Sequence, residues 1–360
     1  DRDKPVRLFP SCRSVSAFEK LNEINEGTYG KVYRARDKET GEIVALKEVK
    51  LDVDDKRGFS IISLRECTLL MQLNHENVLN VTEVVVGQTL KSVYMVMEFL
   101  EHDLRVLMEQ MKGPFLAPEI KCLLLQLIRG IDYLHSNWII HRDLKSANLL
   151  LNNQGILKVA DFGLAREYGS PARLLSPNVV TLWYRAPELL LESKKYTPAI
   201  DMWSIGCIFA ELILQKPIFE CEGGEIAQLN KMFAIMGTPN EDDWPGCSEL
   251  PLMQKFSFTP KRPFQLHNVI SPNSVTTHTW DLLCKLLTMD PAQRITASEA
   301  LKHPYFTEAP PPQHPSMMPT FPSKAEGGRS MRNRTYDDKL HGRNAEEDQG
   351  LLNNSLYSSS

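Results

Sequence analysis

The spacing of apolar residues changes period near residue 100, and this change constrains the fold more than any other sequence feature. Before it, short apolar runs bounded by glycines predict β-strands, at residues 31–35, 43–49 and 93–97. One helix is predicted among them, near Ser63 to Leu73. From Pro118 onward, apolar residues recur three or four apart, as in a helix with one buried face: Ile120, Leu123, Leu124, Leu127, Ile128, Ile131 and Leu134. Helices are also predicted at residues 200–214 and 280–288, so a strand-rich lobe precedes a helical lobe.

Composition and charge exclude several classes of protein. The 360 residues are 42% hydrophobic and carry a net charge of −4 spread along the chain, so no general or direct binding of nucleic acid is expected. No apolar run approaches the roughly 18 to 20 residues that span a bilayer, and residues 1–12 lack the apolar core of a secretory signal. Seven scattered cysteines without a CxxC pair indicate reduced thiols. We therefore expect a soluble intracellular protein without a membrane partner.

The two ends of the chain are predicted to lie outside the folded core. After Phe306 the sequence is rich in Pro, Ser, Asn and Gly, which cannot bury enough apolar surface to offset the entropy of ordering. We predict that residues 307–360 form a mostly disordered tail and that residues 1–17 form an N-terminal leader. Because the chain starts without Met, it is expected to be a processed or truncated piece of something longer.

Two motifs in the strand-rich half suit phosphate binding. The turn at residues 25–32, NEGTYGKV, contains two glycines that let backbone N–H groups approach phosphate oxygens. The motif Val44-Ala45-Leu46-Lys47 places a lysine at the end of an apolar strand. Each signal is weak alone, because such glycines also occur in ordinary hairpins and such lysines at solvated strand ends.

Two further motifs bring acidic and amide groups together in the helical half. The stretch from His141 to Asn148, HRDLKSAN, places Asp143 five residues before Asn148, which suits a proton acceptor and a metal ligand around one substrate oxygen. Asp161-Phe162-Gly163 joins a carboxylate to an apolar anchor and a flexible glycine, which suits a Mg²⁺ ligand. The four motifs occur in one order and are followed by Ala186-Pro187-Glu188, which argues against separate structural explanations for each.

With these motifs, the sequence resembles a eukaryotic protein kinase from about Phe18 to Phe306. The resemblance implies an α+β, bilobal protein kinase fold with ATP and Mg²⁺ as cofactors. The small N-lobe, strand-rich with one regulatory helix, would cover about residues 18–98, and the hinge about residues 98–103. The larger, mainly helical C-lobe would cover about residues 104–306.

The resemblance also implies a role for each residue of the nucleotide site. Lys47 is expected to bind the α- and β-phosphates and to pair with Glu66 on the small-lobe helix, while Asn148 and Asp161 bind Mg²⁺. The other ATP-binding positions, several of which would also pack in the core, are Ile24, Asn25, Glu26, Gly27, Thr28, Tyr29, Gly30, Lys31, Val32, Ala45, Met97, Glu98, Leu100 and Leu150.

The expected catalytic residues are Asp143, Lys145, Lys47 and Glu66. Asp143 would orient the substrate hydroxyl and accept its proton, while Lys145 steadies the γ-phosphate. A lysine at this position is typical of serine/threonine kinases and not of tyrosine kinases. Asp201 and the Glu188–Arg294 pair resemble structural braces of the family, for which no catalytic role is expected.

Within the kinases, the sequence is most similar to the PITSLRE-type cyclin-dependent kinases. Residues 60–66, SIISLRE, stand at the place of the cyclin-contacting helix. The other stretches that carry the resemblance are Cys12 to Val15, Glu101 to Leu104, Asp161 to Ser170, Val180 to Arg185, Gly237 to Pro239 and Trp244 to Gly246. The resemblance implies an L-type cyclin bound through the Ser60–Glu66 region, nuclear action on transcription and pre-mRNA splicing, and protein substrates with Ser or Thr followed by Pro.

The same resemblance predicts how the kinase is regulated and how it selects substrates. Ser176, before Pro177, stands where the family carries an activating Thr, and the arginines expected to collect its phosphate are Arg65, Arg142 and Arg166. The pocket for the residue after the phosphoacceptor is matched by Val179, Val180 and Arg185, and it would favour proline. Thr28 and Tyr29 match the sites of inhibitory phosphorylation in related kinases.

Three departures from the family pattern leave alternatives open. Asn25 replaces the first glycine of the loop, and Ser176 replaces the activating Thr. Ser60 and Ile62 replace Pro and Thr of the naming motif, so the exact cyclin is open. One alternative is a catalytically weak, cyclin-binding scaffold for RNA-processing factors, although a scaffold has no physical need of the complete catalytic set. Another is an active kinase with a different cyclin and a role in transcription or the cell cycle.

Overall fold

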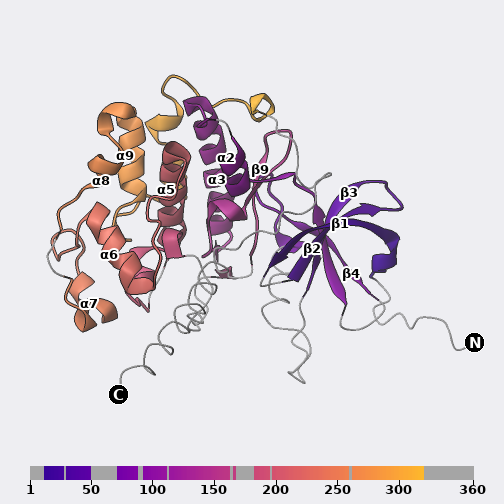
Figure 1. The fold of residues 1–360 in the computed structure, drawn as a ribbon, viewed down its shortest axis with the longest axis horizontal. Helices are drawn as coiled ribbons and strands as arrows, with labels where there is room; N and C mark the ends of the chain where they lie inside the picture. Colours follow the sequence, from indigo (N-terminus) through magenta and orange to yellow (C-terminus); the bar gives the residue numbers. More distant parts are fainter. Residues whose placement is uncertain are drawn as a thin grey trace, which may run out of the picture.

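The computed structural model of the protein describes residues 12–27, 30–49, 71–87, 92–111, 113–162, 165–167, 182–194, 197–258 and 262–319. They form two lobes, a twisted sheet on one side and a mostly helical body on the other (Figure 1). The α+β bilobal fold predicted from the change of period is confirmed.

Five antiparallel strands form the N-lobe sheet, in the order β1-β2-β3-β5-β4. They are β1 (Phe18–Gly27), β2 (Gly30–Asp37), β3 (Ile43–Glu48), β4 (Val81–Val86) and β5 (Val93–Glu98), preceded by the 3-10 helix η1 (Val15–Ala17). The three predicted strands correspond to β2, β3 and β5, whereas no residue range was predicted for β1 or β4. Of the helix predicted near Ser63 to Leu73, only residues 71–73 are described, and the first two of them are helical.

The two faces of β3 belong to different apolar clusters. Leu46 packs with Val96 and Phe18 in a small cluster on the outer side of the sheet, while Ala45 joins the large core that continues into the C-lobe. Because side chains alternate across a strand, Lys47 shares the face of Ala45. This alternation directs the lysine toward the junction of the two lobes.

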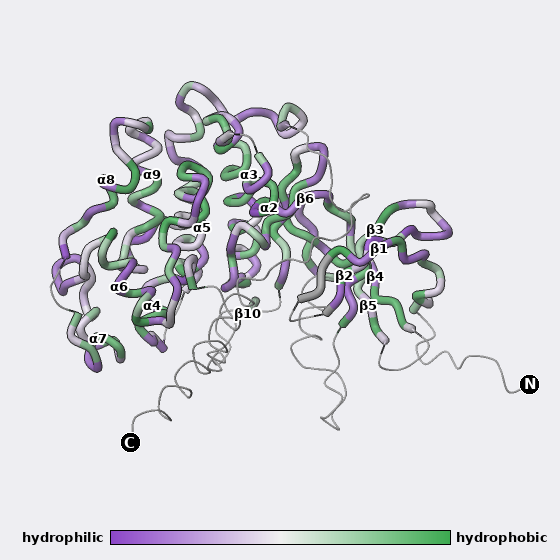
Figure 2. Tube along the Cα trace, in the orientation of Figure 1, coloured by the Kyte–Doolittle hydropathy of each residue, from purple (hydrophilic) through white to green (hydrophobic). Residues whose placement is uncertain are grey.

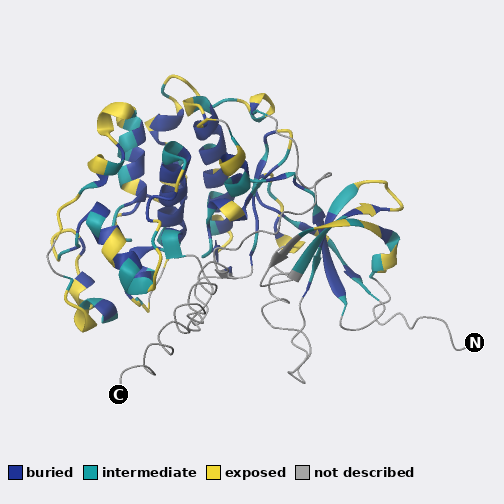
Figure 3. Ribbon diagram, viewed as in Figure 1, coloured by how far each residue is buried: buried dark blue, intermediate teal, exposed yellow. Residues whose placement is uncertain are grey.

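The C-lobe is built on two buried helices, α3 (Ala117–Ser136) and α5 (Ala199–Leu214). Nearly every residue of α5 is buried, so it has no polar face and must lie inside the lobe (Figure 3). Hydrophobic stretches alternate with hydrophilic loops around it (Figure 2). The other α-helices are α2 (Leu104–Gln110), α4 (Pro187–Leu190), α6 (Glu225–Met236), α7 (Pro251–Lys255), α8 (Leu266–Val269), α9 (Thr277–Leu286) and α10 (Ala297–Ala300).

Short strands line the junction between the lobes. They are β6 (His102–Asp103), β8 (Leu149–Leu151) and β9 (Leu157–Val159) in one sheet, and β7 (Ile139–Ile140) with β10 (Arg166–Glu167) in another. The remaining elements are 3-10 helices: η2 (Ser146–Asn148), η3 (Leu182–Tyr184), η4 (Cys247–Glu249), η5 (Pro272–Ser274), η6 (Pro304–Phe306) and η7 (Pro315–Met317).

The predicted C-lobe helices are confirmed, with one shift of boundary. The long helix expected after Pro118 is α3, and the one expected at residues 200–214 is α5. The third begins at Thr277, earlier than predicted, because the Thr276 side chain caps it by accepting a hydrogen bond from the backbone N–H of Thr279.

The structure differs from the predicted disordered tail at residues 307–319, which are packed on the C-lobe. Lys121 of α3 is only 1% exposed, and its Nζ donates to the backbone oxygens of Glu308 at 3.1 Å and Pro310 at 2.8 Å. Further along, the backbone of Pro315 approaches Gly155 so closely that a Cβ there would meet it. A buried ammonium must be paired, and these carbonyl groups together with the Glu308 carboxylate, whose Oε1 lies 3.4 Å from Nζ, satisfy it. Residues 320–360 and 1–11 lie outside the described residues.

Candidate active site

The loop after β7 is held by a carboxylate of α5. Asp201 is fully buried, and its oxygens accept hydrogen bonds from the backbone N–H groups of His141 and Arg142, both at 2.9 Å. His135 Nε2 contributes a third contact at 2.9 Å. Burial raises the pKa of Asp201, but the hydrogen bond from His135 and the nearby positive groups outweigh it and keep the pKa below its ordinary value. The ionised carboxylate fixes Arg142 in a left-handed backbone conformation with φ of 73°.

This loop brings three of the predicted site residues together. Lys145 Nζ lies 3.0 Å from Asp143 Oδ2. The amide nitrogen of Asn148 donates to the backbone oxygen of Asp143 at 2.7 Å and to its Oδ2 at 3.1 Å. The Asn148 side chain can reach back to Asp143 because the 3-10 helix η2, in which Asn148 lies, turns the chain. A carboxylate, an ammonium group and an amide therefore converge at one point.

Asp161 reaches the same junction from the other side. Its Oδ1 lies 3.6 Å from Nζ of Lys47 on β3, across the two lobes. The next residue, Phe162, is buried and its ring packs edge-on against His141 at 5.0 Å between ring centroids. This aromatic contact anchors the segment against the catalytic loop, while Asp161 itself has a φ of 64°. The structure thus joins Lys47, Asp161 and the Asp143 loop.

The oxygens at this point fit a divalent cation. Asp161 Oδ1 is buried and accepts no hydrogen bond from any described residue. Asn148 donates through Nδ2, which leaves its Oδ1 for a cation. A carboxylate and an amide oxygen beside a phosphate-binding lysine suit Mg²⁺, which protein sites bind through few side chains and substrate phosphates. Among the described residues, no group of three or more His, Cys, Asp or Glu side chains could hold a metal ion, so this candidate site offers one carboxylate and one amide.

The apolar residues predicted to bind adenine come from strands before and after the hinge and from the hinge itself. Ala45 pairs with Met97 across β3 and β5, and both side chains are buried. Val32 and Leu150 pack against the same core from β2 and β8. Leu100, which directly follows β5 and Phe99, is also buried. These residues therefore belong to, or border, one apolar core.

The other residues predicted to bind ATP are less enclosed. Glu98 Oε1 forms an ion pair with Lys158 Nζ at 2.6 Å, and Lys31 Nζ lies 3.3 Å from a carboxylate oxygen of Glu23. Ile24 is half-buried on β1.

Several predicted residues cannot be compared with the structure. Outside the described residues lie Thr28, Tyr29, the Ser60–Glu66 region with Arg65 and Glu66, Ser176, Val179 and Val180. Only the backbone is described for Asn25, Glu26, Gly27, Gly30 and Arg166. The backbone of Arg166 pairs with Ile140 of β7, directly before His141 and Arg142. Arg185 Nη1 lies 3.3 Å from Glu225 Oε1, and burial lowers the pKa of this guanidinium.

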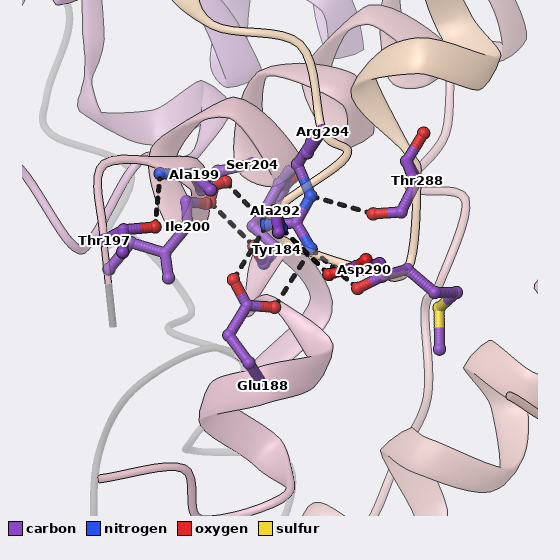
Figure 4. Close-up of polar contacts among 11 residues, drawn as sticks. Tyr184, Glu188, Thr197, Ala199, Ile200, Ser204, Thr288, Asp290, Ala292 and Arg294 are labelled. Atoms are coloured by element: carbon purple, nitrogen blue, oxygen red, sulfur yellow. Dashed lines mark hydrogen bonds and ion pairs between the residues drawn. The ribbon is translucent and has the colours of Figure 1, made fainter. Parts of the chain in front are cut away.

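The predicted brace between Glu188 and Arg294 is a buried bidentate ion pair (Figure 4). The two guanidinium nitrogens lie 2.8 and 3.0 Å from the carboxylate oxygens. Arg294 also donates to the backbone oxygens of Ala199, Thr288 and Met289. All its donors therefore meet acceptors without water.

Two polar positions were missed by the sequence analysis. Asp103 caps α2 by accepting from the backbone N–H groups of Arg105 and Val106, and burial raises its pKa to about 7 against these donors. Glu211 lies buried in α5 with hydrogen bonds to three other elements. The available signal was a second acidic residue in an otherwise apolar helix, because such a residue must find partners.

A comparison with protein families assigns this fold and site to a class. The protein kinase domain model matches residues 18–306. The chain thus belongs to the protein kinase family, whose members use ATP and a divalent metal. In the described residues, no helix combines the length and apolar character needed to cross a membrane.

Relatives narrow the class. Cyclin-dependent kinase 11B of Homo sapiens is 54% identical over 329 residues, which cover 91% of this chain and 41% of the relative. Cyclin-dependent kinase 11 of Dictyostelium discoideum is 53% identical over 315 residues, 88% of this chain and 87% of the relative. Cyclin-dependent kinase G-2 of Oryza sativa subsp. indica is 50% identical over 357 residues, 97% of this chain and 50% of the relative. Within the kinase family, the chain belongs to the cyclin-dependent kinases of type 11, the PITSLRE group, as the sequence motifs predicted.

Proposed function

We propose that the protein is an ATP- and Mg²⁺-dependent, proline-directed protein serine/threonine kinase activated by a cyclin. The observation that carries the proposal is the convergence of Asp143, Lys145 and Asn148 with Lys47 and Asp161 at the junction of the lobes. The chain spans about two fifths of the human relatives, 41% and 42% of their lengths. The activity of the whole protein is therefore part of the proposal and is not taken over from these relatives.

Each residue of the site has a separate task in phosphoryl transfer. Lys47 binds the α- and β-phosphates, and Asp143 orients the substrate hydroxyl and takes its proton. Lys145, 3.0 Å from Asp143, places a positive charge beside the attacking oxygen and the γ-phosphate. Mg²⁺, when bound at Asp161 and Asn148, offsets the negative charge of the phosphates. Glu66 would complete the set by pairing with Lys47.

The proposed regulation rests on the family motifs. A cyclin, of the L type by resemblance, binds the Ser60–Glu66 region. Phosphorylation of Ser176 adds a charge for the arginines Arg65, Arg142 and Arg166. Val179, Val180 and Arg185 bind the residue after the phosphoacceptor, while phosphorylation at Thr28 or Tyr29 inhibits. The site of action is the nucleus, the cytoplasm or both, in transcription, pre-mRNA splicing or cell-cycle control.

The test is the phosphoryl transfer of the full chain, purified with its bound partner and with that partner identified. Transfer to a Ser-Pro peptide is expected, with a much lower kcat/KM for the matched Ser-Ala peptide. Asp161→Asn should lower the rate at least about a thousandfold, because it removes a charge that acts on the transition state. Asp242→Asn, a substitution at an exposed C-lobe aspartate, is the matched control and should keep the rate.

Several outcomes would contradict the proposal. Full activity of Asp161→Asn would refute the site assignment. Equal turnover of both peptides would refute proline direction alone. A partner-bound wild-type chain with no transfer would favour the cyclin-binding scaffold.

A further inference from the structure

A buried carboxylate outside the proposed catalytic set joins three parts of the C-lobe. Glu211 of α5 is 0% exposed. Its Oε1 accepts hydrogen bonds from Arg105 Nη1 at 2.8 Å and from Ser146 Oγ at 3.1 Å, and its Oε2 accepts from the Tyr184 hydroxyl at 2.8 Å. The three donors come from α2, η2 and η3. One side chain thus connects the helix after the hinge, the catalytic loop and the segment that leads to α4.

Two of these partners stand next to residues of the proposed reaction. Ser146 follows Lys145 in the chain, and Tyr184 precedes Arg185. The hydroxyl groups of Ser146 and Tyr184 also contact each other at 3.1 Å, which closes a triangle with Glu211. The backbone oxygen of Tyr184 accepts from Ser204 Oγ of α5 at 2.8 Å. A shift of Glu211 would therefore move both the loop that carries Lys145 and the segment that carries Arg185.

Charge makes Arg105 the controlling member of this network. Arg105 is the cation in contact with Glu211 among the described residues, and its Nε is held by Glu109 at 2.8 Å. The other groups near the carboxylate, Tyr184 and Cys207, are neutral with pKa values raised by burial. An ionised Glu211 can accept from all three donors, whereas a protonated one must itself donate through one oxygen. Without its cation, a carboxylate buried this deeply is driven toward the protonated form.

We propose that Arg105 is a positioning residue for the phosphoacceptor peptide. By keeping Glu211 an acceptor, it fixes the loop that carries Lys145 relative to the segment that carries Arg185. The inference rests on the proposed kinase function, because that function makes these two segments the two sides of the peptide site. It assigns Arg105 a part in binding the protein substrate and none in binding ATP.

The test compares steady-state kinetics of Arg105→Met, Arg105→Lys and wild type, each as the full chain with its bound partner. For a short Ser-Pro peptide, Arg105→Met should lower kcat/KM about tenfold or more, the effect of one lost charge-assisted contact. The KM for ATP should change less than about twofold, within what substitutions away from a site produce. Arg105→Lys should recover most of the loss, since its ammonium still supplies a cation and a donor. Arg36→Met, which removes an exposed N-lobe partner of Glu19, is the matched control.

A second, milder variant keeps the proposal testable if Arg105→Met does not fold. Tyr184→Phe removes only the hydroxyl and should also weaken the peptide kcat/KM selectively, by a smaller factor than Arg105→Met. Parallel losses in peptide and ATP kinetics would indicate a general structural role and overturn the proposal, as would unchanged peptide kinetics in both variants. An inactive wild-type complex would refute the kinase function and this inference together, whereas an active wild type with an unaffected Arg105→Met would refute this inference alone.

Discussion

Each lobe is tied together by an arginine that joins distant segments, but the two arginines lie in different surroundings. In the C-lobe, Arg294 and Glu188 have side chains only 0% and 2% exposed. In the N-lobe, Arg13 is 31% exposed and contacts Asp37 at 2.9 Å, Glu83 at 2.7 Å and Glu39 at 3.3 Å. The N-lobe arginine thus has more acidic partners, but it is itself partly exposed, and water competes for two of them, Glu39 and Glu83.

The comparison indicates that burial, and not the number of ion pairs, sets the energetic importance of a brace. A buried pair gains little over an apolar pair, but removing one partner leaves a charge that cannot be solvated. An exposed pair releases its remaining partner into water at small cost. The helical lobe therefore depends strongly on one contact, whereas the sheet lobe spreads its dependence over several weak ones.

The largest effect is expected for Arg294→Met. This substitution leaves Glu188 buried and unpaired and deprives three backbone oxygens of a donor, so the loss should be about 3–5 kcal/mol of unfolding free energy. Chemical denaturation of the purified chain measures it.

A double variant separates charge from packing at this brace. Glu188→Gln combined with Arg294→Met should recover part of the loss, because no buried charge remains. A loss below about 1 kcal/mol for Arg294→Met, the level of an exposed pair, would contradict the role assigned to burial.

A smaller effect is expected for Arg13→Met. Asp37 is 5% exposed and the Arg13 side chain lowers its pKa by hydrogen bonding, against the effect of burial. Asp37 also accepts from the backbone N–H of Glu39 at 2.8 Å, so it keeps a partner. We expect a loss of about 1–2 kcal/mol, between an exposed and a buried pair.

Thermal unfolding of Arg13→Met beside Arg36→Met tests this intermediate value. The Arg36 partner Glu19 is half-exposed, so that control should lose almost nothing. If Arg13→Met destabilised the protein as much as Arg294→Met, the number of acidic partners would outweigh burial.

How far the sequence predicted the molecule depended on the distance over which a contact forms. The period of α3 and α5 is local, so the order of the two lobes could be predicted from the residues, whereas the convergence of Lys47 with Asp161 was predicted only from the family resemblance that the motifs carry. Strand β4 was missed because its sequence, VTEVVV, combines an exposed Thr with a run of valines and shows no clear alternation.

Contacts between distant segments left no local pattern. Arg105 and Glu211 are 106 residues apart, and Lys121 meets the backbone of residues 308 and 310 from 187 and 189 residues away. Only the general rule that buried charges need partners pointed to them. The rule predicts that a partner exists but does not identify it.

The smallest effect is expected for Glu241, which lies in the C-lobe but is exposed. Glu241 therefore shows whether the loss of stability depends on burial or on the lobe in which the residue lies. Its oxygens accept hydrogen bonds from the backbone N–H groups of Gly246 at 2.6 Å and Ser248 at 2.9 Å, and the contacts with Ser248 and Gly246 lower its pKa to about 2. A carboxylate whose folded pKa lies below its unfolded value contributes stability above the unfolded pKa and loses it as the pH falls toward the folded one.

Glu241→Gln should therefore melt slightly below wild type at neutral pH, by less than Arg13→Met, and the difference should shrink as the pH falls from about 4.5 to about 2. The amide keeps one acceptor oxygen, but its NH2 group cannot accept, so the substitution removes the charge and one of the two backbone hydrogen bonds. Melting curves of both proteins across this pH range measure the change. A destabilisation as large as that of Arg294→Met would show that the C-lobe is sensitive to any lost carboxylate, buried or not. A difference that grew on acidification would have the wrong sign for a carboxylate stabilised in its ionised form.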